Sequence, residues 1–282
     1  MQGTWFPFAI RRTLILSLLP VSLSCGGGDF PKYYQLGDLR ILAITAPTPE
    51  VAPGTTVTLT PYISDLNGAG RTIAYSAEAC TDPGVAFGAE PSCAKATDRV
   101  SLGTGNLAGL AGPNYTGAVT TFNVTVPASI LTGRSAIDAH NGVAYLFVLT
   151  LTPSGSKSVT SFKRLIASSK ATKNSNPTLS DILANGSSLA ALPATNSTLA
   201  PSIAAGSSES YTWQSLTGST PQSEVLSMSW FTSDGTLDKS RTTSTESNGW
   251  KPPGTAPAGR NVLLIGVLRD DRGGSAITIK SL

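Results

Sequence analysis

Short stretches of this chain alternate apolar and polar residues, which is the pattern of β-strands with one buried face. Turn residues rich in Gly, Pro, Asn and Asp separate these stretches, and no long helical period interrupts them. The pattern therefore predicts an all-β chain. The predicted strands are 40–46, 55–63, 73–77, 121–126, 142–151, 158–167, 179–183, 208–215, 225–232, 261–268 and 276–281.

The N-terminal residues have a different pattern. Arg11 and Arg12 precede an apolar run, 14–23, that is shorter than the roughly 20 residues a membrane-spanning helix needs. A basic start and a short apolar run are typical of a secretory signal peptide. Residues 21–25, VSLSC, resemble the lipobox of bacterial lipoproteins, with Ser22 in place of the usual leucine. The resemblance implies cleavage after residue 24 and lipidation of Cys25. The alternative is ordinary secretion, with Cys25 as a free thiol.

A glycine run, 26–28, follows the cysteine and predicts a flexible tether. In the sorting rule of bacterial lipoproteins, an aspartate directly after the cysteine retains the protein at the inner membrane. This chain has Gly26 there, so the resemblance implies an outer-membrane location and a membrane partner reached through the lipid anchor.

The two halves of the remaining chain repeat one plan. Residues 51–60 match 203–212, and the closing hairpins match at a shorter offset, which predicts an insertion in the first half. A polar stretch rich in Lys, Asn and Ser separates the halves. The expected order is a signal peptide at 1–24, a lipidated cysteine and tether at 25–37, a first domain at 38–168, a linker at 169–177 and a second domain at 178–282.

The second half resembles bacterial Ig-like and PKD-like domains. The matching residues are Ser229-Trp230 with Asp234-Gly235, then 250–253, then 259–268 with the turn 270–274. The first half matches more loosely, with Ala77 where a central tryptophan would stand. The resemblance implies two tandem Ig-like β-sandwich domains and supplies no active site.

Composition narrows the function classes. The formal net charge is +3 and falls to +1 once Arg11 and Arg12 are removed, so no strong field attracts nucleic acid. Cys80 and Cys93 form an even pair, which in an oxidising compartment predicts a disulfide within the insertion. We expect no cofactor.

Three features have residue types found in catalytic motifs. The G-x-G-x-x-A stretch 103–108 and the S-x-x-K stretch 154–157 are interpreted as a glycine-rich loop and a hairpin turn, because neither has the strand and helix context of its motif. His140 is the one histidine, and no G-x-S-x-G accompanies it. We expect His140 to face solvent on a loop, and we expect the protein not to be an enzyme.

Two weaker sites stay open. Asp65, Asn67, Asp270 and Asp271 could offer oxygens to Ca²⁺, but the same residue types also make turns. A sugar could stack on an exposed pair formed by Trp250 and Tyr115, whereas the prolines beside Trp250 favour a packed strand-end residue. The sequence thus favours a non-catalytic envelope protein that binds another envelope protein or a polysaccharide. A carbohydrate-binding module and an envelope hydrolase are the alternatives.

Overall fold

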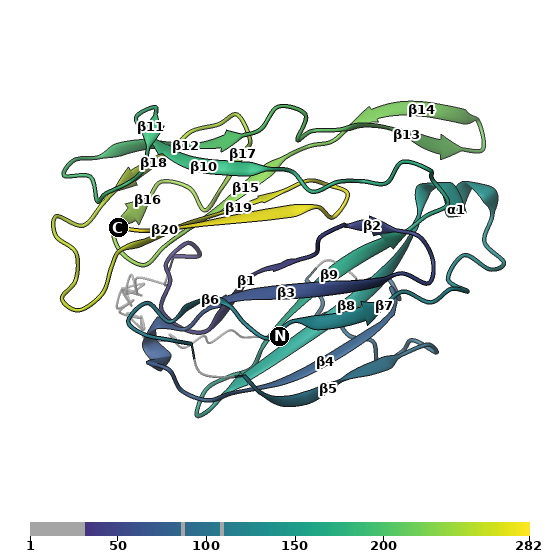
Figure 1. Ribbon diagram of the computed structural model, residues 1–282, viewed down its shortest axis with the longest axis horizontal. Coiled ribbons are helices and arrows are strands. Elements are labelled where there is room, and N and C mark those ends of the chain that lie inside the picture. The colour runs from purple at the N-terminus through teal and green to yellow at the C-terminus, as the bar shows by residue number, and fades with distance from the viewer. Residues whose placement is uncertain (1–31, 86–87, 108–109) are drawn as a thin grey trace, which may run out of the picture. The chain divides into compact units, whose positions relative to one another are not determined.

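The computed structural model describes residues 32–85, 88–107 and 110–282 (Figure 1). Contacts divide the chain into Met1–Lys32 and Tyr33–Leu282, and every described strand belongs to the second unit. The predicted signal peptide, with Arg11 and Arg12, and the predicted lipidation site Cys25 lie outside the described residues. No described helix is both long and apolar enough to cross a membrane.

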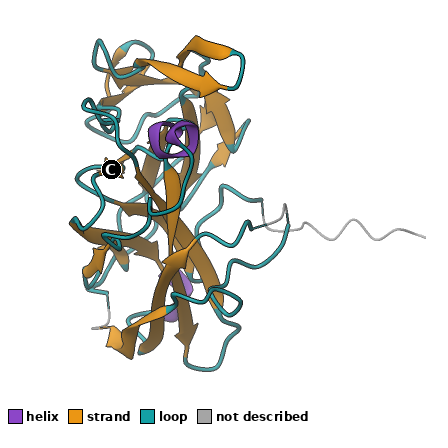
Figure 2. Ribbon diagram, turned by 90° about the vertical axis from the view of Figure 1, so that its right-hand side faces the viewer, coloured by secondary structure: helices purple, strands orange, loops and turns teal. Residues whose placement is uncertain are grey.

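The prediction of an all-β sandwich architecture is confirmed, since strands account for most of the ordered elements (Figure 2). In the first half, one sheet contains β1, β3, β6 and β7, and the other has the order β2-β9-β8-β4-β5. Their inner faces enclose a core that includes Leu59, Val124, Phe147 and Leu165. The strands are β1 (Arg40–Thr45), β2 (Glu50–Val51), β3 (Thr56–Ser64), β4 (Ile73–Thr81), β5 (Val100–Leu107), β6 (Thr116–Ala118), β7 (Phe122–Thr125), β8 (Val143–Pro153) and β9 (Val159–Ala167).

The second half also has two large sheets, with the orders β11-β10-β12-β18-β16 and β17-β15-β19-β20. A separate hairpin, β13-β14, adds a third sheet. Trp230, Met228 and Trp250 fill the core. The strands are β10 (Leu179–Ala184), β11 (Ser187–Ser188), β12 (Ser197–Ile203), β13 (Ser210–Ser215), β14 (Gly218–Ser223), β15 (Ser227–Thr232), β16 (Thr236–Leu237), β17 (Arg241–Thr243), β18 (Asn248–Lys251), β19 (Leu263–Arg269) and β20 (Ser275–Ser281).

The two halves have the same order of strands in one sheet each, as the predicted repeat requires. The predicted alignment of 51–60 with 203–212 is wrong, because these segments are not equivalent strands. The order β5-β4-β8-β9 in the first half corresponds to β17-β15-β19-β20 in the second. The counterpart of β3 is β12, because each pairs with an early strand and with a later one, whereas 210–212 belong to the extra hairpin. Serine- and threonine-rich strands match one another too easily for this register to be found from sequence.

A third apolar cluster lies between the halves. Leu36, Leu42 and Ala43 pack against Phe231 and three residues of β19. The chain before β1 joins in as well, since Leu36 N donates to Thr232 O (2.8 Å) and Thr232 N donates to Tyr34 O (2.9 Å). The sequence predicts Tyr34 and Leu36 within the tether, but in the structure both are buried beside β15.

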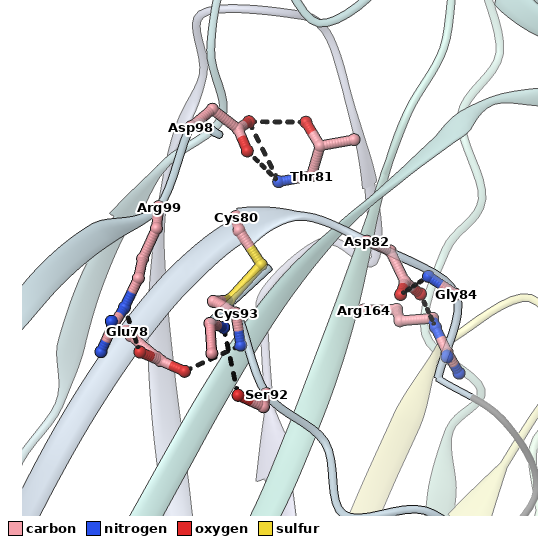
Figure 3. Close-up of a disulfide and its surroundings, with 11 residues drawn as sticks. Glu78, Cys80, Thr81, Asp82, Gly84, Ser92, Cys93, Asp98, Arg99 and Arg164 are labelled. Atoms are coloured by element: carbon pink, nitrogen blue, oxygen red, sulfur yellow. Dashed lines mark hydrogen bonds and ion pairs between the residues drawn. A yellow bond between two sulfur atoms is a disulfide. The ribbon is translucent and has the colours of Figure 1, made fainter. Parts of the chain in front are cut away.

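The predicted disulfide Cys80–Cys93 is confirmed, with the two Cα atoms 5.8 Å apart (Figure 3). It lies on the outer face of its sheet with Leu146 and Val148. Carboxylates secure the neighbouring chain: Glu78 accepts from Cys93 N (2.9 Å), and Asp98 accepts from Thr81 N (3.0 Å). The bridge therefore pins the inserted segment to β4.

Two local predictions differ from the structure. Gly103 and Gly105 lie in the edge strand β5 rather than in a loop, where Gly105 leaves space beside the ring of Tyr75. His140 belongs to the short helix α1 (Ala136–Asn141), which Ser135 caps by accepting from Asp138 N (3.0 Å). A Ser-x-x-Asp start is a helix signal that the strand-dominated pattern obscured.

Candidate functional site

A cavity of about 640 Å³ lies where the two halves meet, and we call it the junction cavity. Strands β1 and β9 and the end of α1 line it from the first half. Strand β13 and the turn 270–274 line it from the second half. Strand β9 contributes side chains from both of its faces, because it pairs with β2 at Ile166 and Ala167 and no other described strand covers the rest of that edge.

Arg272 forms the centre of a charged cluster on the cavity wall. Its Nη2 lies 2.7 Å from Glu50 Oε2, and its Nη1 lies 3.2 Å from Glu224 Oε1. The guanidinium also lies over the Tyr211 ring, 4.4 Å from its centroid. Lys170 Nζ is 3.3 Å from Glu50 Oε1, so the Glu50 carboxylate forms ion pairs with both Lys170 and Arg272.

The pKa values of the two buried carboxylates of this cluster, Glu50 and Glu224, shift in opposite directions. Burial raises the pKa of Glu50, but donation from Ser168 Oγ and Asn174 N, with the charges of Lys170 and Arg272, outweighs burial and lowers that pKa below its ordinary value. Burial raises the pKa of Glu224, and its hydrogen bond from Glu209 N and the charge of Arg272 do not reverse the shift. Glu50 is therefore the carboxylate that holds its charge most firmly.

Lys163 and Arg269 also line the cavity, and neither has an ion pair among the described residues. Lys163 is 7% exposed and donates to Gly273 O (2.5 Å) and Ser275 Oγ (3.2 Å). Arg269 donates to Ser229 Oγ (3.0 Å) and Leu42 O (2.8 Å). Burial lowers the pKa of Lys163 to about 8. These two cations have neutral oxygens as partners.

Aromatic side chains from both halves complete the lining: Tyr33 and Phe162 from the first half, Tyr211 and Trp213 from the second. Trp213 is 49% exposed, although tryptophan is among the side chains that gain most from burial. Arg164 stacks over Phe162 at 4.8 Å and pairs with Asp82 beside the disulfide (Figure 3). The disulfide region thus helps to position one wall of the cavity.

The hairpin β13-β14 is held at the cavity by α1, and the two lie side by side in Figure 1. Asn141 Nδ2 donates to Gln214 O (2.8 Å), and Gln214 N donates to Asn141 Oδ1 (2.9 Å). The backbone of Gln214 therefore points away from β14. In an antiparallel pair this orientation repeats every second residue, so Pro221, opposite Thr212, has its nitrogen on the outer edge of β14.

His140 is half-buried rather than solvent-facing, which corrects the expectation from sequence. It borders a second cavity of about 370 Å³ together with Lys170, Lys173 and Glu209. Its Nε2 is buried and has no hydrogen-bond partner in the described part of the chain. The histidine turns inward because α1 packs against β13 through its neighbour Asn141.

The structure does not bring the proposed sugar-stacking pair together. Trp250 is 1% exposed in the core of the second half, so its ring is not available for stacking. Tyr115 lies in the first half between β5 and β6, with a positive φ of 38°. Trp250 is thus the packed strand-end residue of the two interpretations.

The four calcium candidates fall at two separate turns. Asp65 accepts from Arg71 Nε and Nη2, both at 2.8 Å, and Asn67 Nδ2 donates to Asp38 (2.9 Å). Asp270 accepts from Arg272 N (2.9 Å) and Gly274 N (2.6 Å), while Asp271 accepts from Val225 N (3.3 Å). No cluster of metal-ligating side chains occurs among the residues described. These side chains act in turn chemistry.

Sequence reasoning missed the cluster around Arg272 and the cations Lys163 and Arg269. The sequence holds one signal for Lys163. This residue lies on the same face of β9 as Leu165 and Ala167, which face the core. A lysine in the apolar phase of a strand indicates a buried charge. The contacts of Glu50 and Arg272 had no such signal, because the two residues are 222 positions apart.

Comparisons with known proteins add no function. No protein-family model matches the chain, and no curated protein matches it. Red sea bream transglutaminase is 10% identical and has a TM-score of 0.29, with 88% of this chain covered. The YadV chaperone is 8% identical, with a TM-score of 0.27 and 85% of this chain covered. Spo0M, a sporulation control protein from Bacillus subtilis, is 10% identical, with a TM-score of 0.29 and 87% of this chain covered.

The matches cover 31% of the transglutaminase, 99% of the YadV chaperone and 91% of Spo0M. The chain therefore spans about a third of the transglutaminase's length. All three TM-scores are too low to support a statement about this chain.

Proposed function

We propose that this protein is exported, is anchored to the outer membrane by a lipid on Cys25, and has a non-catalytic binding or scaffolding role in the cell envelope. The disulfide Cys80–Cys93 supports export, because disulfides persist in oxidising compartments. The predicted signal peptide and the lipobox resemblance support the anchor. The shared strand order of the two halves supports the Ig-like resemblance.

One observation carries the binding role: two β-sandwich halves enclose a cavity whose wall is tied together by Arg272. Arg272 contacts Glu50 of the first half and Glu224 of the second, so buried ion pairs fix the wall of the cavity. Pre-formed pockets of this kind are the usual form of small-ligand sites. In this proposal the halves are a rigid body that the glycine run connects to the membrane.

A crosslinked pull-down of tagged protein from intact cells tests the proposal, with Cys25→Ala as the matched control. We expect wild-type protein to fractionate with outer membranes and to recover a stoichiometric envelope partner. The Cys25→Ala chain should leave the membrane fraction and recover less of the partner. Equal membrane association of both chains would overturn the lipid anchor.

The same pull-down separates the binding role from its alternatives. Recovery of polysaccharide without a protein partner would replace scaffolding by carbohydrate binding. The exposed Trp213 beside Tyr211 in the cavity is the specific observation that favours this second candidate. Recovery of neither a protein nor a polysaccharide would overturn the binding role.

A further inference from the structure

The geometry points to an oxyanion site in the junction cavity. We infer that Lys163 and Arg269 bind the carboxylate or phosphate of a small ligand, and that aromatic side chains of the cavity contact its ring. The inference rests on the proposed binding role and goes beyond it by naming the chemical class of the ligand.

The first support is the hydrogen-bonding capacity of the two cations. An ammonium has three N–H donors, and Lys163 directs two of them to Gly273 O and Ser275 Oγ. A guanidinium has five donors, and Arg269 has two described acceptors, Ser229 Oγ and Leu42 O. Both residues thus retain donors on a cavity wall, and among the described residues no carboxylate lies within ion-pair distance of either cation.

The second support is a contrast with three other partly buried arginines, each of which has a carboxylate partner. Arg71 meets both oxygens of Asp65, and Arg260 meets both oxygens of Asp234. Arg272 has Glu50 and Glu224. A buried charge without a counter-charge costs stability, and such costs are typical of functional sites. Lys163 and Arg269 therefore have the form of a site whose counter-charge is supplied from outside.

Asp270 is the carboxylate nearest in sequence, and it is already engaged. It accepts from the backbone amides of Arg272 and Gly274 and from Asn174 Nδ2 (3.3 Å). These hydrogen bonds stabilise the turn 270–274 and direct the Asp270 carboxylate toward the turn. Asp270 thus shapes the turn whose Gly273 carbonyl orients the Lys163 ammonium.

The third support is the rest of the lining. Phe162 lines the cavity from the face of β9 opposite to that of Lys163, and Tyr211 and Trp213 line it from the second half. Ring faces and a few convergent charges are the usual composition of a small-ligand site, and the volume of about 640 Å³ falls in the usual range. A sugar or similar ring bearing an acidic group fits this combination.

Isothermal titration of the purified full-length protein in detergent tests the inference with four probes: glucose, glucuronate, glucose 6-phosphate and inorganic phosphate. We expect glucuronate or glucose 6-phosphate to bind with a Kd below about 1 mM, and glucose not to bind. Whichever acidic sugar binds more tightly identifies the carboxylate or the phosphate. Failure of both acidic sugars, or equal binding of glucose, would overturn the inference. So would inorganic phosphate binding as tightly as the sugars, because the ring would then contribute nothing.

Three variants and one control variant locate the site. Lys163→Met and Arg269→Met should each weaken binding of the acidic sugar by about tenfold or more, whereas the exposed Lys157→Met should not. Trp213→Ala should weaken binding of the sugar and leave inorganic phosphate unaffected. Unchanged affinity in both cation variants would overturn the inference.

A measurement on the wild-type chain avoids any dependence on how the variants fold. The acidic sugar should slow acetylation of Lys163 by acetic anhydride and leave acetylation of Lys157 unchanged, as mass spectrometry would resolve. Equal acetylation of Lys163 with and without ligand would contradict the assignment. If titration fails while the pull-down succeeds, the ligand class is wrong and the envelope role stands.

Discussion

Arg272 Nη2 and Glu50 Oε2 lie 2.7 Å apart although the two residues are separated by 222 positions in the sequence. The side chains are 12% and 1% exposed. Glu50 belongs to the short strand β2, and Arg272 belongs to the turn between β19 and β20. This one pair therefore connects the first half of the chain to the second across a cavity wall.

Replacing Arg272 should destabilise the protein strongly. Arg272→Met leaves Glu50 and Glu224 buried without their shared cation, and breaking a buried ion pair in this way costs about 3–5 kcal/mol. The matched control is Arg99→Met, because Arg99 pairs with Glu78 but is 55% exposed. Surface pairs contribute at most about 1 kcal/mol. Urea denaturation of the three proteins measures the difference, and similar losses in both variants would contradict the prediction.

Removing the charge of Lys163 should stabilise the folded protein at neutral pH. The pKa is about 8 in the folded state, below the ordinary 10.5, so the unfolded chain binds more protons between pH 8 and 10.5. Stability due to this residue therefore rises with pH across that window. Asp270 and Arg269 act on the ammonium in opposite directions, and burial exceeds both.

Lys163→Met should accordingly raise the free energy of unfolding by up to about 3 kcal/mol near pH 7, less what the hydrogen bonds to Gly273 and Ser275 contribute. The gain should shrink as the pH approaches 10. Denaturation at pH 7 and pH 10 checks this, with Lys157→Met as the control. A gain that does not change with pH would contradict the prediction.

The turn after β15 requires a glycine for two reasons that can be separated. Gly235 has a φ of 82°, and a Cβ there would lie 2.5 Å from Lys251 O. Gly186 has the same φ of 82°, but a Cβ there would meet nothing within 4 Å. Gly186→Ala should cost about 1–2 kcal/mol from backbone strain alone. Gly235→Ala should cost a further 1–3 kcal/mol, roughly, from the clash. Equal losses in chemical denaturation would show that the backbone relaxes.

The disulfide should stabilise the first half without being needed for its strand order. Cys80 and Cys93 are 13 positions apart, and a bridge over a loop of this length contributes about 3 kcal/mol in the chain-entropy model. The double variant Cys80→Ala with Cys93→Ala should therefore lower the midpoint of thermal unfolding. Reducing agent should lower the wild-type midpoint and leave that of the variant unchanged. A shift of the variant by reducing agent would point to another thiol.

Strands could be predicted from sequence where alternation was strong. The hairpin of β8 and β9 and that of β19 and β20 appear within a few residues of their predicted bounds, because turn residues rich in Gly, Ser and Asp separate the two apolar stretches of each hairpin. The register between the halves could not be predicted. Short Ser- and Thr-rich strands carry little positional information, and the extra hairpin β13-β14 shifted the internal match by one strand.

The candidate site was largely invisible for a different reason. Its residues come from β1, β9, α1, β13 and a turn, and only the packing of one half on the other brings them together. The alternation of apolar and polar residues indicates which face of a strand is buried, but not what covers it. Leu42 and Phe231 are each buried by a surface on the other half of the chain. Charged residues such as Glu50 then become core residues at that contact.

The hairpin β13-β14 also bears on how copies of this chain behave when crowded. An isolated two-stranded ribbon presents two open backbone edges, which are templates for pairing between molecules. Asn141 occupies one edge at Gln214, and Pro221 removes a donor from the other. The ribbon can therefore present Trp213 and the tip residue Leu216 to solvent while resisting strand-by-strand polymerisation. Its blocked backbone edges thus allow the hairpin to expose apolar side chains without offering a template for strand pairing between copies.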